Sequence, residues 1–119
     1  MREILFRGKR VDNGEWVEGY YFRQYGSNEI VTADEQYHIV LETRSEYTGC
    51  TDKNGTRIFE HDIIKIKYPF DEPCNEAVSW NVEGARWNFG GADAYFANPQ
   101  KWAEVIGNVF DNPELLKGD

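Results

Sequence analysis

The stretch EILFRGKRVDNGEWVEGYYFRQ, residues 3–24, decides the fold class. It holds two segments of alternating side-chain character, at about 3–11 and 15–24, separated by Asp12-Asn13-Gly14. Alternation with a period of two is typical of a strand with one buried face. Asn-Gly closes tight hairpins because both of its residues tolerate positive φ. The stretch therefore predicts an antiparallel hairpin with Asn13 and Gly14 in the turn.

Alternating segments and turn signals continue along the chain. A short strand is expected over 28–32, and Tyr37, Ile39 and Leu41 share one face of the next strand. From Asp62, isoleucines alternate with lysines, which predicts a half-buried strand. Pro69 and Pro73 predict a loop over 70–74 that interrupts the sheet. The remaining predicted elements are a turn at 52–55, a hairpin over 78–89 and a last strand over 104–110.

Two Asn-Pro pairs mark the only helical signals. Each places a capping side chain before a proline suited to the first helical position, so single-turn helices are expected at about 98–103 and 112–117. We predict an all-β fold, mostly antiparallel with small barrel-like sheets, plus one or two short single-turn helices. The 119 residues make one domain over 1–119, or two small lobes that share a core.

Charge is distributed unevenly. The formal net charge is −8, which disfavours binding to phosphate backbones. Residues 1–10 nevertheless carry a net +3, and Arg7, Lys9 and Arg10 are candidate interaction residues. If the first strand is an open sheet edge, its cations are either ordinary solvated charges or a contact for an acidic neighbour such as a second copy of the chain. A homo-oligomer is expected on this reasoning.

Aromatic residues are dense between 80 and 102. Core packing is the favoured interpretation because large rings fill small β cores. The alternatives are a contact surface for a protein and a stacking platform for a ligand. Trp80, Trp87 and Trp102 are the candidate interaction residues of this segment.

Catalytic and metal-binding signatures are weak. His38, Cys50, His61 and Cys74 are spread singly, without the paired spacing of a zinc site, and a reducing compartment would keep the two thiols unpaired. His61 adjoins Asp62, yet neighbours in a strand point to opposite faces. The turn at Asp52 lacks the distal glutamate of a calcium loop. We expect no catalytic residues, no metal and no cofactor.

Nothing in the sequence predicts membrane insertion or export. No apolar run approaches the ~18 residues of a spanning helix, and the N-terminus has no apolar signal region. A cytoplasmic protein without membrane contact is expected.

Three stretches resemble the YopX family of small phage and prophage proteins. They are ILFR at 4–7, EYTGCTDKNGTRIFEHDIIKI at 46–66 and EVIGNVFDNPELL at 104–116. The chain departs from the family pattern at Gly8-Lys9, where Ala-Trp is usual, and at His61, where Gly is usual. The resemblance implies a β-rich protein of the bacterial host cytoplasm, encoded by a phage or prophage. It implies no enzymatic activity, cofactor or catalytic residue.

Three functional hypotheses follow. The leading one is a non-enzymatic module that binds a host or phage protein, because no acid, base, nucleophile or metal set converges in the sequence. The second is a nucleic-acid-associated protein of phage replication or regulation, acting through its basic first strand. The third is an enzyme whose site is assembled from residues far apart in the chain.

Overall fold

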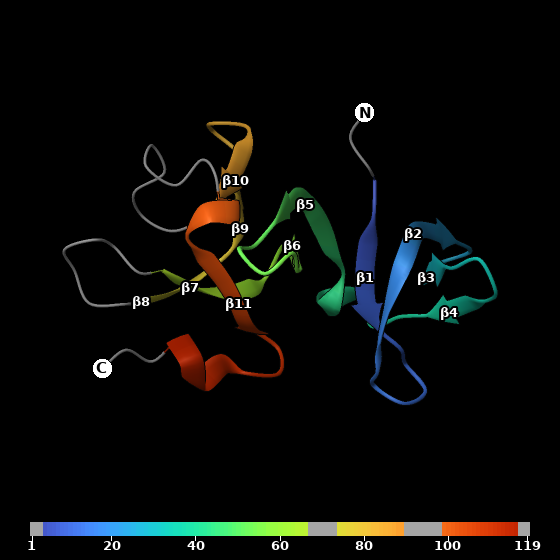
Figure 1. The fold of residues 1–119 in the computed structure, drawn as a ribbon. Helices are drawn as coiled ribbons and strands as arrows, with labels where there is room; N and C mark the ends of the chain where they lie inside the picture. Colours follow the sequence, from blue (N-terminus) through green and yellow to red (C-terminus); the bar gives the residue numbers. More distant parts are fainter. Residues whose placement is uncertain (1–3, 67–73, 90–98, 117–119) are drawn as a thin grey trace. The chain divides into compact units, whose positions relative to one another are not determined.

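The computed structural model describes residues 4–66, 74–89 and 99–116, and their regular structure is strands and short 3-10 turns. The chain divides into two compact units, Met1–Tyr47 and Thr48–Asp119. The predicted all-β, antiparallel fold class is confirmed (Figure 1). Within the described residues, no helix is long and apolar enough to cross a membrane.

The first unit is built from consecutive antiparallel strands. They are β1 (Phe6–Lys9), β2 (Trp16–Gln24), β3 (Ser27–Val31) and β4 (Gln36–His38), followed by the 3-10 turn η1 (Leu41–Thr43) and the start of β5 (Ser45–Thr51). The hydrogen-bonded order is β4-β3-β2-β1-β5. The sheet curls, since Ile39 beyond β4 forms a bridge with Arg10 beyond β1.

One expectation for the first hairpin needs correction. The hairpin forms with Lys9 opposite Trp16, but only Gly14 of the predicted turn pair has positive φ, at 75°. The Gly14 amide donates to the Arg10 carbonyl and the Arg10 amide to the Glu15 carbonyl, which makes a wider turn. The two-residue turn with both φ values positive lies between β2 and β3 instead, at Tyr25 and Gly26.

The first strand is not an open sheet edge. Phe6 and Arg7 pair with β2 on one side and with β5 on the other. The amide of Tyr47 also donates to the carbonyl of Leu5, at 2.7 Å. The expectation that the first strand is an open edge available to a second copy is therefore wrong, because β5 returns to occupy that edge.

The predicted strand through Leu41 is shorter than expected. β4 ends at His38, and Leu41 already begins η1. The hydroxyl of Thr43 accepts the amide of Lys9 at 2.9 Å and donates to the carbonyl of Val40 at 2.6 Å. These bonds turn the chain away from β4. The bond from Lys9 to Thr43 joins residues that are distant in sequence, so the local alternation pattern could not predict it.

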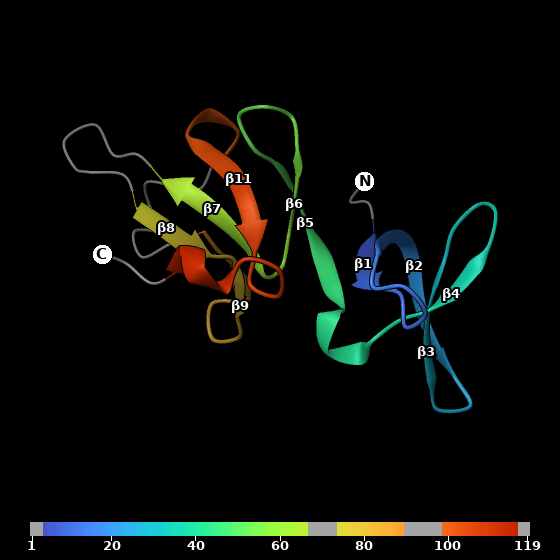
Figure 2. The same cartoon turned by 90° about the horizontal axis from the view of Figure 1, so that it is seen from below.

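The second unit contains a three-stranded sheet and a separate hairpin. Its sheet has the order β11-β7-β8, with β11 (Ala103–Asn108), β7 (Asp62–Ile66) and β8 (Cys74–Ala77), as Figure 2 shows. The hairpin joins β9 (Ser79–Asn81) to β10 (Arg86–Asn88). The other elements are β6 (Arg57–Phe59), η3 (Pro99–Lys101) and η4 (Pro113–Leu116).

Most predictions for this unit hold. The hairpin at 78–89, both single-turn helices and the last strand are confirmed, the strand beginning one residue early and ending at Asn108. The strand from Asp62 is more buried than predicted, because β7 is the central strand and Ile63, Ile64 and Ile66 are all inaccessible to solvent. Cys74 opens β8 rather than closing the predicted loop, whose positions 70–73 lie outside the described residues.

Candidate interaction surfaces

Two of the predicted cations lie against one aromatic ring in the first unit. The guanidinium carbon of Arg7 is 4.6 Å from the centroid of the Trp16 ring, and the ammonium nitrogen of Lys9 is 5.5 Å from it. Both cations project from β1 to the same face of the sheet, since Lys9 is opposite Trp16 and Arg7 is opposite Glu18. Cation–π attraction therefore holds these two charges over the sheet.

Arg10 occupies a different environment. Its Nε and Nη2 donate to the two carboxylate oxygens of Asp12, at 2.9 and 2.6 Å, and its guanidinium carbon lies 4.5 Å from the Tyr37 ring centroid. The hydrogen bond between them raises the pKa of Arg10 and lowers the pKa of Asp12. A hydrogen bond to the Glu35 carboxylate raises the pKa of Tyr37 above its ordinary value. Arg10 is thus fixed in position and fully charged.

A cleft of about 360 Å³ opens beside Arg10. It is lined by Arg10, Val11 and Asp12 from the connection between β1 and β2, and by residues 35–38. Its volume is within the range of small-ligand sites, and its lining combines a tyrosine ring, an exposed valine and charged groups. Of its lining residues, only Arg10 is among the predicted interaction residues.

A serine, a histidine and a buried glutamate meet near this cleft. Ser27 Oγ lies 2.8 Å from His38 Nδ1, and an oxygen of the Glu29 carboxylate lies 3.5 Å from that same nitrogen. The Gln36 amide donates to the other Glu29 oxygen. In a catalytic triad the acid binds one ring nitrogen and orients the histidine, while the opposite nitrogen accepts the serine proton. This arrangement lacks that feature and instead joins β3 to β4.

The predicted tryptophans divide between core and surface. Trp87 and Trp102 pack against the core of the second unit, which consists of Ile58, Ile64, Ile66, Val78, Phe89 and Ala103. Trp80 is opposite Trp87 in the β9–β10 hairpin and keeps 42% of its surface exposed. The two rings meet edge to face, with centroids 5.0 Å apart. Tyr95 and Phe96 of the predicted aromatic segment lie outside the described residues.

The motifs of the YopX resemblance serve the fold. Asp52 is buried, its Oδ1 accepts the amides of Asn54 and Thr56, and its Oδ2 accepts the amide of Val105 in β11. The buried Asp62 carboxylate accepts the amide of Phe59 in β6. The predicted turn at Asp52 is confirmed, with its carboxylate directed at backbone donors.

The closing motif at 104–116 also stabilises the fold. The side chain of Asn108 accepts the amides of Phe110 and Asp111, at 3.0 and 2.9 Å, and donates to the Asp111 carboxylate. The Asn112 side chain accepts the amide of Asn108. Asn108 and Asn112 thus form the turn that precedes η4.

The four possible soft-metal ligands do not form a described cluster. Among the residues that the structure covers, no three His, Cys, Asp or Glu side chains are grouped to hold a metal. Burial raises the pKa of the Cys50 thiol, with a smaller opposing effect from Thr48, so its reactive thiolate is suppressed at neutral pH. His61 faces Phe110 edge to face, at 5.1 Å between centroids.

The fold defines a small, all-β protein of antiparallel sheets, and the comparisons assign its family. The chain belongs to the YopX family, whose model, described as YopX protein, matches residues 5–117. A search of curated proteins finds no match. The fold is similar to that of protein EF1440 from Enterococcus faecalis, at 22% sequence identity and a TM-score of 0.56, covering 98% of this chain and 100% of that chain.

Proposed function

We propose that this YopX-family protein is a non-enzymatic interaction module, encoded by a phage or prophage, that binds another protein in the host cytoplasm. The proposal rests on the exposed side chain of Trp80. Tryptophan is among the residues most enriched at the energetic centres of protein interfaces. Trp80 presents a large apolar surface already held in one orientation by Trp87, so little side-chain entropy is lost on binding.

The surroundings of Trp80 have the composition of an interface. Val82, in the same hairpin, is 80% exposed, which extends the apolar surface into the turn. Glu83 and Arg86 are exposed in the turn and in β10, and supply charged groups next to it. An apolar centre with a polar rim is typical of protein–protein contacts.

The experiment compares capture by three forms of the full chain. Wild type, Trp80→Ser and the control Tyr20→Ser are immobilised and exposed to lysate of infected host cells. Tyr20 is 68% exposed in β2, so the control removes an exposed ring from another surface. We expect at least one protein to be retained by wild type and control and depleted about tenfold or more by Trp80→Ser. Equal retention by all three folded forms would refute the assignment of Trp80.

A second candidate function is nucleic-acid binding through the first unit. Arg7 and Lys9 with Trp16 combine cations and an aromatic ring, the chemistry that binds single strands. Glu18 is opposite Arg7 on the same face, and the net charge of −8 opposes approach of a polyanion. We therefore rank nucleic-acid binding below protein binding as a proposed function.

A further inference from the structure

The turn between β2 and β3 holds a tyrosine in a conformation that favours glycine. Gln24 pairs with Ser27, so Tyr25 and Gly26 are the two central residues, with φ of 51° and 79°. Two positive values define a type I′ turn, for which Asn-Gly is the preferred sequence. The left-handed conformation costs a non-glycine residue about 1 kcal/mol.

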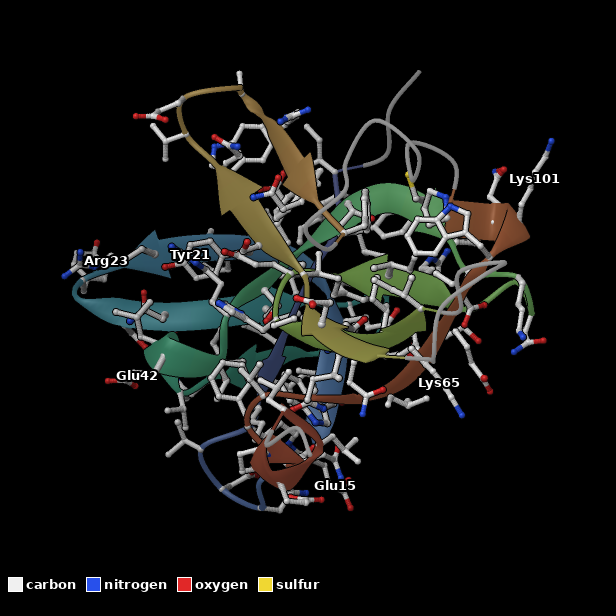
Figure 3. The ribbon with its side chains drawn as sticks, turned by 90° about the vertical axis from the view of Figure 1, so that its left-hand side faces the viewer. Glu15, Tyr21, Arg23, Glu42, Lys65 and Lys101 are labelled. Atoms are coloured by element: carbon white, nitrogen blue, oxygen red, sulfur yellow. The ribbon has the colours of Figure 1, made fainter. Side chains whose placement is uncertain are left out.

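The side chain of Tyr25 does not compensate for this strain through burial. Tyr25 is 98% exposed, so its ring contributes almost no buried surface to the fold. Strained backbone positions cluster at functional sites. Arg23, Gln24 and Gly26 are exposed beside it, and Figure 3 shows Arg23 at the outer end of this hairpin. The tip (residues 23–26) therefore presents a ring and a cation on a convex turn.

The cleft beside Arg10 offers groups that an aromatic ring and a cation can contact. It is concave, with Val11 63% exposed and a tyrosine ring in its lining. Two carboxylates lie at the cleft: Asp12 is paired with Arg10, and Glu35 is exposed and suits a cation such as Arg23. An incoming aromatic ring can contact both Val11 and the fixed guanidinium of Arg10. Tyr25 cannot fill the cleft of its own chain, because its ring is almost fully exposed.

We propose that the cleft receives the tip of a second copy of the chain, with Tyr25 seated among Arg10, Val11 and Tyr37. Charge complementarity favours this occupant, since the Arg23 cation of the tip meets the exposed Glu35 carboxylate of the cleft. This contact is separate from the Trp80 surface, and it replaces β1 as the route to self-association. The other possible occupant, an unrelated protein, leaves the isolated chain monomeric.

Sedimentation equilibrium tests the contact at about 50 µM protein, above a micromolar dissociation constant. Wild type is expected to associate, less strongly at high salt. Tyr25→Asn, which suits the turn, is expected to be monomeric while its thermal midpoint equals or exceeds that of wild type. Val11→Lys, which adds bulk and a cation to the cleft, is also expected to be monomeric. The control Tyr20→Ser, which removes an exposed ring from β2, should associate like wild type.

Mixing the two monomeric variants gives the decisive result. Tyr25→Asn keeps an intact cleft and Val11→Lys keeps an intact tip, so the equimolar mixture should form a one-to-one complex. Monomeric wild type, association of Tyr25→Asn at the wild-type level, or a mixture that stays monomeric while wild type associates would each overturn the proposal.

Discussion

At the scale of single residues, the buried carboxylate of Asp52 acts on the backbone. It accepts three amides, two from its own turn and one from β11, which is distant in sequence. Hydrogen bonds from backbone N–H groups to a carboxylate are stronger than neutral ones. The side chain thereby fixes both the turn and its connection to the central sheet of the second unit.

Asp52→Ala should therefore be strongly destabilising. Three backbone donors lose their acceptor in a buried place, so the free energy of unfolding should fall by about 3 kcal/mol. Urea denaturation followed by tryptophan fluorescence measures the change. Asp12→Ala is the matched control, because Asp12 is exposed. This substitution should change the free energy of unfolding by less than about 0.5 kcal/mol. Equal stabilities for the two variants would contradict this role.

Single residues also differ in how far their backbone conformation can be predicted from the sequence. The turn at Asp52 was predictable, since Asp-Lys-Asn-Gly has its own local signature. Tyr25 was not, because tyrosine is a poor residue for positive φ and gives no turn signal. His61 has φ of 74°, which explains why Gly is usual there in the family pattern, although its departure from that pattern was visible in the sequence.

At the scale of elements, β2 and β3 approach unusually closely at Gly19. A β-carbon placed there would lie 2.2 Å from the carbonyl oxygen of Val31, a backbone atom that cannot rotate away. Tyr20 is the residue that pairs with Val31, so the clash falls inside the hydrogen-bonded part of the hairpin. A side chain at position 19 would therefore force β2 and β3 apart.

Gly19→Ala should accordingly damage the first unit. Separating the strands to admit a methyl group should lower the free energy of unfolding by about 3 kcal/mol. Gly84→Ala is the control, since its methyl group would meet only the flexible side chain of Arg86. Thermal unfolding by circular dichroism should show a much lower midpoint for Gly19→Ala than for Gly84→Ala. Similar midpoints would show that the hairpin can relax at this point.

Elements were predictable where their signals were local. The hairpins at 3–24 and 78–89 and the two Asn-Pro turns follow from patterns within a few residues. The position of β1 inside the sheet could not be predicted from such local patterns. It depends on β5, which pairs Glu46 with Phe6 from a distant part of the chain. Burial of Ile63 beside Lys65 likewise results from the central place of β7 in its sheet.

At the scale of the whole molecule, the candidate sites come from tertiary structure. Arg7 and Lys9 were chosen for their charge, and the structure brings both to Trp16. The cleft beside Arg10 joins a loop near residue 11 to residues 35–38, and no spacing rule links these segments. Trp80 could be named from the sequence, but its exposure next to the more buried Trp87 could not.

The net charge of −8 leads to the last prediction, which concerns nucleic acid. Binding to a phosphate backbone requires several cations free to displace counterions. Here Arg10 is held by Asp12, and Arg7 and Lys9 share one tryptophan ring next to Glu18. Fluorescence anisotropy with random duplex DNA at ~150 mM salt should therefore show no submicromolar binding. Lowering the salt should reveal only weak binding, which the double variant Arg7→Ser, Lys9→Ser should abolish. Tight binding at ~150 mM salt that this double variant removes would instead favour nucleic acid as the partner of the first unit.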